Sequence, residues 1–226
     1  MKIIVFDFDE TLGDFSQLGD FIMALEFFIK KKISRQILYS ILTLFPNVFR
    51  TDLFKILHFI QKQKKLKHIN KVMIYTNNMG PRSWVLGIKT FIELKLKTKL
   101  FDRIISAYKI NGKQIEKKRT THQKTYNDLI NIINFSNKSD ILFFDDQLHL
   151  IMDHPNVHYV KVKPYTYVMN NEYMVRKFLN SNVGSIIKHK ADFLQFIKNK
   201  LPLNKKSNIT IETYRWMKNI TQFIED

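Results

Sequence analysis

With 226 residues, 45% of them hydrophobic, the chain is long enough for one domain with an appendage, and this composition argues against wholesale disorder. It contains no cysteine, which excludes disulfides and thiolate metal sites and is compatible with a reducing compartment. The formal net charge of +17 predicts attraction to polyanions such as nucleic acid, anionic lipid surfaces or phosphorylated proteins, although a high general frequency of lysine explains the charge equally well.

The first expected element is a short run of β-branched and aromatic residues, 3–6, which predicts a strand buried on both faces. This strand ends in two carboxylates, Asp7 and Asp9. A strand followed by an acidic turn is common in α/β proteins, so the two acids indicate a functional site only if other motifs join them.

Helices are expected after this strand. The glycine-flanked segment 13–19 predicts a loop or short flap over the end of the strand. Asp20 and Ser34 are candidate N-caps, because their side chains can accept hydrogen bonds from the free N–H groups of a first helical turn. The first two helices form a small insertion at about 20–45. The three helices expected before the second strand are 21–31, 34–44 and 53–60.

Four further apolar runs predict strands, and the helical stretches between them predict parallel β-α-β units. Asn111-Gly112 is a hairpin signal. From Pro164 onward the pattern is mainly helical, apart from a linker at 201–208. The expected strands are 71–78, 101–106, 141–146 and 157–162, and the expected helices are 83–94, 124–133, 171–179, 185–200 and 210–224.

These elements predict an α/β fold in which helices flank a central, mostly parallel sheet. We expect a catalytic domain at 1–165, which includes the insertion after the first strand. The remaining residues, 166–226, are expected to form a helical C-terminal extension packed on the core.

Three of the predicted strands end in polar groups suited to chemistry. The ends of parallel strands meet at one edge of a sheet, so these groups can lie together. Four acids would repel one another there unless a cation joined them, and carboxylate oxygens favour a hard metal such as Mg²⁺. Such a metal, with a buried lysine, would also offset the charge of a phosphate, which predicts phosphoryl chemistry. The groups are Asp7 and Asp9, Thr76 and Asn77, and Asp145 and Asp146.

The stretch Asp7-Phe-Asp9-Glu-Thr11 resembles the Asp-x-Asp-x-Thr signature of haloacid dehalogenase (HAD)-type phosphatases. Thr76-Asn77 is similar to the second motif of that superfamily, and Asp145-Asp146 to the fourth. All three motifs follow predicted strands, and the resemblance covers roughly residues 1–162. It implies a Rossmann-like HAD fold and a Mg²⁺-dependent enzyme that hydrolyses a phosphomonoester through an aspartyl-phosphate intermediate.

The resemblance also implies roles for the residues of the first two motifs. Asp7 would be the nucleophile that takes the phosphoryl group. Asp9 would protonate the leaving oxygen and then activate water, and Thr11 would help to orient both acids. Thr76 and Asn77 would bind phosphate oxygens, the latter through its side chain or its backbone.

The remaining implied roles concern the metal and a basic residue. Mg²⁺ would be held by Asp7, by the backbone carbonyl of Asp9, and by Asp145 or Asp146, both of which stay candidates. The third motif of the superfamily is a Lys or Arg that neutralises the phosphate and the nucleophile. Lys124 is favoured, because the interval between it and the following strand suits one helix and a loop. Three nearby basic residues compete for this role: Lys117, Lys118 and Arg119.

The substrate class stays open between several alternatives. The insertion is smaller than a full cap domain, which predicts an open site and a macromolecular substrate such as a phosphoprotein. The first and fourth motifs resemble those of RNA polymerase II C-terminal-domain phosphatases, whereas Thr76-Asn77-Asn78 resembles the second motif of polynucleotide 3′-phosphatases and histidinol phosphatases. A polynucleotide 3′-phosphatase, a small-metabolite phosphatase and a non-catalytic HAD-fold binding module for a polyanionic partner are the alternatives.

The apolar stretches are too short or too interrupted to span a bilayer, and the N-terminal apolar run is too short for a signal peptide. We therefore expect no integral membrane association and an intracellular location, in the cytoplasm or nucleus. Nucleic acid stays a candidate partner because of the basic charge.

Overall fold

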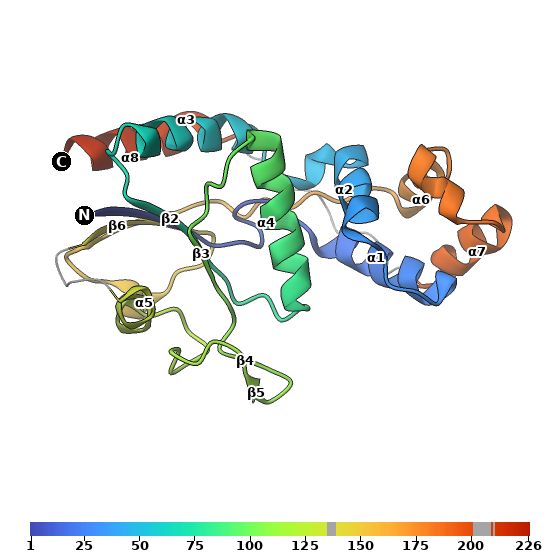
Figure 1. The fold of residues 1–226 in the computed structure, drawn as a ribbon, viewed down its shortest axis with the longest axis horizontal. Helices are drawn as coiled ribbons and strands as arrows, with labels where there is room; N and C mark the ends of the chain where they lie inside the picture. The colour runs from blue at the N-terminus through green and yellow to red at the C-terminus, as the bar shows by residue number, and fades with distance from the viewer. Residues whose placement is uncertain (135–138, 201–208, 210) are drawn as a thin grey trace.

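The computed structural model describes residues 1–134, 139–200, 209 and 211–226. Its centre is a five-stranded sheet with the order β3-β2-β1-β6-β7, in which each neighbouring pair is parallel (Figure 1). This arrangement confirms the predicted α/β fold with a parallel sheet flanked by helices. The strands are β1 (Lys2–Phe6), β2 (Lys71–Tyr75), β3 (Arg103–Ile105), β6 (Asp140–Asp145) and β7 (Val157–Lys161).

Helices cover both faces of this sheet. Ile4 and Phe6 of β1 belong to a core shared with α3, α4 and α8, whereas Ile3 and Val5 face a second core shared with α5. Because successive side chains of a strand point to opposite faces, a strand covered on both sides is apolar throughout. Within the described residues, no helix has both the length and the apolar character that crossing a bilayer would require. The α-helices are α1 (Ser16–Ile29), α2 (Arg35–Leu44), α3 (Leu53–Lys65), α4 (Arg82–Leu96), α5 (Tyr126–Ile133), α6 (Asn171–Leu179), α7 (Lys190–Lys200) and α8 (Thr213–Glu225).

The central strand, β1, lies where the connections of the sheet change direction. From β1 the chain passes to β2 and β3 on one side, and α5 then carries it back to β6 and β7 on the other side. Ligands of open parallel sheets bind at such a switch point, beyond the carboxyl ends of the two strands. Asp7 follows β1 and Asp145 ends β6, so both carboxylates lie at this point.

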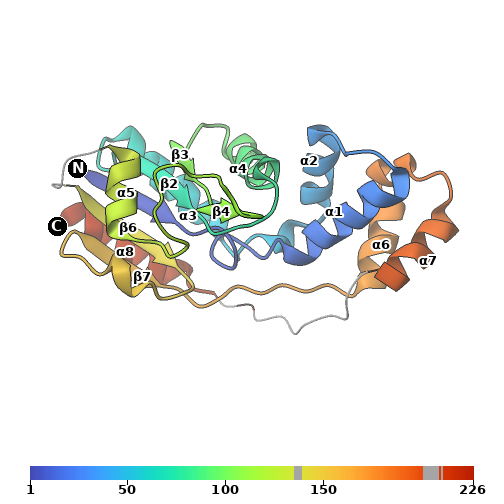
Figure 2. The ribbon, with the colours of Figure 1, turned by 90° about the horizontal axis from the view of Figure 1, so that it is seen from below.

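A helical lobe lies at the end of the molecule opposite the two termini (Figures 1 and 2). It consists of α1 and α2, which follow β1, and of α6 and α7, which follow the sheet. Phe21 of α1 packs edge-on against Phe178 of α6 and Phe193 of α7, with ring centroids 5.2 and 6.2 Å away. Helices from the expected insertion and from the expected C-terminal extension therefore share one apolar core.

The predicted start of the first helix is wrong. We expected a loop up to residue 19 and a cap at Asp20, but α1 begins at Ser16. The Asp14 carboxylate accepts hydrogen bonds from the Ser16 N–H group at 3.1 Å and from the Ser16 hydroxyl at 2.6 Å. This local polar contact orders the chain before Gly19, which lies inside the helix.

Two other local predictions are confirmed. The Ser34 hydroxyl accepts a hydrogen bond from the N–H group of Ile37 at 3.3 Å and caps α2. Asn111 and Gly112 join β4 (Lys109–Ile110) to β5 (Lys113–Gln114), and both have positive φ angles, 49° and 77°. A tight hairpin turn requires this conformation, which Asn and Gly adopt readily.

The helix predicted at 185–200 is shorter than expected. A 3₁₀-helix spans Asn182–Ile186, and α7 begins only at Lys190. Between them Ile187 is buried in an extended conformation, which interrupts helical hydrogen bonding. The predicted linker at 201–208 lies outside the described residues.

The C-terminal helix α8 packs across β1 and β6 through Trp216, which is fully buried. Its ring stacks on Phe6 of β1 with centroids 5.9 Å apart, and it lies 4.7 Å from the ring of Phe144 of β6. The two strands that lead to the acids are therefore supported by the last helix of the chain.

We expect Trp216→Ala to lower the free energy of unfolding by about 3–5 kcal/mol, because the cavity left by a large buried ring closes only in part. Chemical denaturation measures this quantity. Tyr214→Ala is the matched control on the same helix, since Tyr214 is 82% exposed. Equal losses in the two variants would contradict the packing of α8 on the sheet.

Candidate active site

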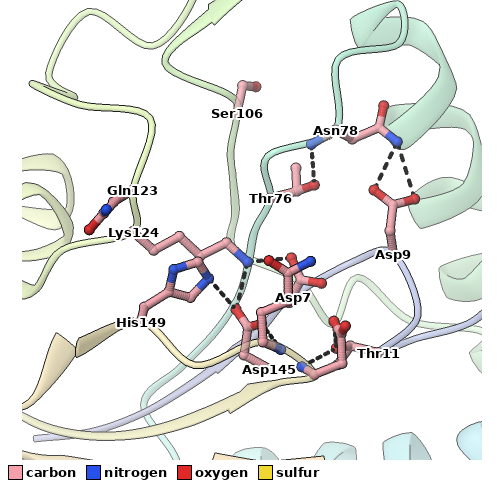
Figure 3. A network of polar contacts seen from close by, with 12 residues as sticks. Asp7, Asp9, Thr11, Thr76, Asn78, Ser106, Gln123, Lys124, Asp145 and His149 are labelled. Carbon is pink, nitrogen blue, oxygen red and sulfur yellow. Dashed lines mark hydrogen bonds and ion pairs between the residues drawn. The ribbon is translucent and has the colours of Figure 1, made fainter. Parts of the chain in front are cut away.

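Lys124 is the basic residue that lies among the acids (Figure 3). Its side chain is 2% exposed, and its ammonium group donates hydrogen bonds to Asp7 Oδ1 and, at 2.7 Å, to Asp145 Oδ2. Contrary to the prediction, Lys124 does not open the helix. Thr125 is the N-cap of α5, and its hydroxyl accepts a hydrogen bond from the Asp128 N–H group at 3.0 Å. Lys124 therefore projects from the extended segment just before the helix.

The three competing basic residues have other positions. Lys117 and Lys118 are exposed, and the Lys118 ammonium group bonds to the main-chain carbonyl of Asn131. Arg119 is buried, and its guanidinium group donates to main-chain carbonyls of the segments that follow β2 and β3 and of the loop before Lys124. Arg119 thus holds the loop that leads to Lys124. The four carbonyls belong to Thr76, Ser106, His122 and Gln123.

Asp7, Asp145 and Asp146 form a buried group that can hold a metal ion, because one carboxylate oxygen from each lies within 4.8 Å of the others. The parallel pairing of β1 with β6 brings these acids together. Thr11 fixes Asp146 at two points: its hydroxyl accepts from the Asp146 N–H group at 3.2 Å and donates to Asp146 Oδ1 at 3.3 Å. The first and fourth motifs are therefore in direct contact.

Burial and mutual repulsion set the charge of this group. Burial raises the pKa of Asp7, while Lys124 opposes that change. Burial also disfavours the ionised form of Asp145, but His149 and Lys124 outweigh it and lower the pKa. Burial, together with Asp7 and Asp145, raises the pKa of Asp146 to about 7. Three full negative charges are thus disfavoured near neutral pH unless a cation binds, and a divalent metal supplies that charge.

His149 lies next to the acids, although the sequence pattern does not indicate it. Its Nε2 atom is 3.4 Å from Asp145 Oδ2. The Tyr159 hydroxyl on β7 holds the intervening turn, since it accepts from the His149 N–H group at 3.3 Å and donates to the Gln147 carbonyl at 2.6 Å. His149 is one of seven histidines without ligand-like spacing, so only the course of the turn brings it here.

Of the residues after β2, Thr76 and Asn78 face the site and Asn77 does not. The Thr76 side chain is buried, and its hydroxyl accepts a hydrogen bond from the Asn78 N–H group at 2.9 Å. Asn77 is exposed, and its side chain makes no hydrogen bond to the described part of the chain. Alternate residues of an extended segment point the same way, and this periodicity could have indicated Asn78 as the partner of Thr76. The predicted phosphate contact of Asn77 stays a prediction for its backbone N–H group.

The Asp9 carboxylate points toward Asn78 rather than toward Lys124 (Figure 3). It therefore lies outside the group of three carboxylates that can hold a metal ion, and the predicted contact of its backbone carbonyl with a metal stays a prediction. Burial raises the pKa of Asp9 to about 6, even though the hydrogen bond from Asn78 lowers it. Asp9 can thus exchange a proton near neutral pH, as an acid/base group must.

The turn that carries Asp9 is held by Arg50, a residue that belongs to none of the sequence motifs. The buried guanidinium group of Arg50 donates to the main-chain carbonyls of Glu10 at 2.7 Å and of Thr11 at 2.6 Å. The backbone is left-handed at Glu10, with φ 56°. At Gly13 a Cβ atom would lie 2.2 Å from the carbonyl oxygen of Val48, so only glycine fits. These contacts restrict the turn to one backbone conformation.

Comparison of the chain with protein-family models, with curated proteins and with solved structures gave no match. The interpretation of the site therefore depends on the residues themselves and on their arrangement.

We expect Lys124→Met to lower the free energy of unfolding by about 3–5 kcal/mol in metal-free solution at neutral pH, because it leaves buried acids without their cation. Urea denaturation with a chelator present measures this loss. Added Mg²⁺ should restore part of it, since the metal supplies the missing positive charge. Lys117→Met is the exposed control, and a loss equal to that of Lys124→Met would contradict the role of the buried contact.

The raised pKa values of Asp9 and Asp146 predict a pH-dependent stability. Both groups bind protons more tightly in the folded chain than in the unfolded chain, where the ordinary value is 3.8. The free energy of unfolding of the metal-free protein should therefore fall through these groups as the pH rises from about 4 to about 7. Thermal melting across this range measures the slope. Asp146→Asn should flatten it, and an unchanged slope would contradict the raised pKa.

Proposed function

We propose that the protein is a Mg²⁺-dependent HAD-type phosphatase that hydrolyses a phosphomonoester through an aspartyl-phosphate intermediate. The observation that carries this proposal is the contact of Lys124 with both Asp7 and Asp145 at the switch point of the sheet. The proposed nucleophile, Asp7, then lies beside a fixed cation and two further carboxylates that can help to hold a metal ion. Transfer of a phosphoryl group to a carboxylate needs this combination, because the incoming phosphate and the nucleophile are both negative.

In the proposed reaction, a carboxylate oxygen of Asp7 attacks phosphorus and the ester P–O bond breaks. The leaving oxygen takes a proton from Asp9. Water then attacks the phosphorus of the aspartyl-phosphate and gives its proton to Asp9, which releases inorganic phosphate and restores Asp7. Mg²⁺, held by Asp7, Asp145 and Asp146, would stabilise the charge on the phosphoryl oxygens.

The remaining motif residues bind and orient. The Thr76 hydroxyl accepts a hydrogen bond from the Asn78 N–H group, so the proton of the hydroxyl is free to donate to a phosphate oxygen. The backbone N–H group of Asn77 is a second proposed phosphate donor. Thr11 holds Asp146 through two hydrogen bonds and thereby orients a proposed metal ligand. Lys124 neutralises both the nucleophile and the bound phosphate.

We further propose a macromolecular substrate such as a phosphoprotein, with residues 1–165 as the catalytic domain. Side chains that follow two of the motif strands are exposed: Met79 at 63% and Leu148 at 58%. This exposure supports an open site. The net charge of +17 supports a polyanionic substrate, which makes a polynucleotide 3′-phosphatase the second candidate. The alternative to an enzyme is a non-catalytic module that binds a polyanionic partner.

Asp7→Asn should lower the Mg²⁺-dependent hydrolysis of an aryl phosphate by at least about 10³-fold, because the amide cannot act as the nucleophile. Steady-state release of the aryl alcohol measures this. Asp192→Asn, on the exposed face of α7, is the matched control and should keep wild-type activity. Wild-type rates in Asp7→Asn would exclude Asp7 as the nucleophile.

The same assay separates the substrate classes when wild-type protein is given a phosphoserine peptide and 3′-phosphorylated DNA. Turnover of the peptide supports a phosphoprotein substrate, and turnover of the DNA supports the second candidate. Hydrolysis of neither macromolecule, with turnover of the aryl phosphate, favours a small metabolite. Tight binding of a polyanion without hydrolysis of any phosphomonoester in Mg²⁺ favours the binding module.

A further inference from the structure

We propose that Asn78 is the positioning residue for Asp9, which it holds in the orientation from which Asp9 exchanges protons during the reaction. The Asn78 side-chain amide donates hydrogen bonds to both carboxylate oxygens of Asp9, to Oδ1 at 3.1 Å and to Oδ2 at 2.9 Å (Figure 3). Contact with both oxygens fixes the plane of the carboxylate as well as its direction. This inference rests on the proposed phosphatase function.

The orientation of the Asn78 amide is itself determined by its surroundings. Its oxygen accepts a hydrogen bond from the Gly80 N–H group at 2.9 Å. Because that partner is a donor, the oxygen of the amide must face it, and the NH₂ group must then face Asp9. The Asn78 N–H group donates to the Thr76 hydroxyl at 2.9 Å. Asn78 is therefore held at its backbone and at its amide oxygen before it contacts Asp9.

The partner of Asp9 differs from that of the two acids in contact with Lys124. Asp7 and Asp145 each contact Lys124, whereas the amide of Asn78 is the side-chain donor to Asp9 within the described residues. Asp9 also lies in a turn and not in a strand, so the sheet does not set its side-chain direction. Asn78 connects this acid to Thr76, the proposed phosphate-binding hydroxyl, and so sets the distance between proton donor and phosphate.

The chemistry of the first step makes this role measurable. As the bond from Asp7 to phosphorus forms and the ester P–O bond breaks, the leaving oxygen keeps the bonding electron pair and takes the proton of Asp9. An alkyl alcohol leaves poorly without that proton. A 4-nitrophenolate ion is stable without it. Misplacement of Asp9 should therefore slow the cleavage of alkyl phosphates selectively.

Asn78→Ala is expected to lower kcat/KM for a phosphoserine peptide or another alkyl phosphate by about 10- to 100-fold, and for 4-nitrophenyl phosphate by less than about three-fold. The kcat/KM value is the appropriate measure, because it reports the steps up to formation of the aspartyl-phosphate. Asn131→Ala is the matched control, since Asn131 is exposed on α5, and it should leave both values unchanged.

A double-mutant cycle distinguishes positioning from a general structural effect. Asp9→Asn removes the proton donor, so Asn78→Ala should cause no further selective loss in that background. Fully additive losses would contradict the proposal, as would equal losses on the two substrates in the single variant. Circular dichroism checks that each variant folds. Should Asn78→Ala fail to fold, Asn78→Leu, which is similar in size and has no donor for Asp9, replaces it with the same expected selectivity.

Failure of the inference and failure of the proposed function give different results. If wild-type protein hydrolyses no phosphomonoester in Mg²⁺, the function is wrong and the inference falls with it. If wild-type protein is active and Asn78→Ala shows no preference between the two leaving groups, the positioning role is wrong and the function stands.

Discussion

The contact of the buried Lys124 ammonium group with Asp7 and Asp145 is the interaction on which the rest of the site depends. Two carboxylates at the ends of adjacent strands would repel each other strongly where little water can screen them, and one cation in contact with both reduces that repulsion. Removing these charges from water costs free energy, so the cluster is a constraint on the fold and not a source of its stability. The apolar packing of the sheet must offset that cost. Trp216 of the last helix adds to this packing, because its ring contacts both strands.

Two buried arginines hold the loops that carry Asp9 and Lys124. Arg119 binds four main-chain carbonyls and directs the loop before Lys124, while Arg50 binds carbonyls of the turn after Asp9. A guanidinium group suits this task because its planar fork presents five donors and stays charged. Glu212 pairs with Arg50 at 3.4 Å, which connects the start of α8 to the turn after Asp9.

The helical lobe is tied to the same turn. Gln17, in the first turn of α1, exchanges two hydrogen bonds with the backbone of Met169, donating to the carbonyl at 2.7 Å and accepting from the N–H group at 2.9 Å. Met169 lies between β7 and α6, and α1 begins three residues after Gly13. These bonds therefore connect the segment after the sheet to the start of the helix that follows the turn. The early start of α1 at Ser16 is part of this arrangement, which explains why a helix cap judged from sequence spacing was misplaced.

The sequence by itself determined the parallel sheet and the acids at its switch point, because apolar runs and the residues that end them are local signals. It also favoured Lys124 among four basic residues, and the structure places Lys124 in contact with the acids. Only the tertiary structure decided that Asn78 contacts Asp9, that His149 lies beside Asp145, and that Arg50 holds the turn after Asp9. The contacts of Asn78 and Arg50 join residues 69 and 39 positions apart, whereas His149 lies only four residues after Asp145 and reaches it through the conformation of the turn between them. Loops of this kind take their conformation from hydrogen bonds that no local pattern encodes.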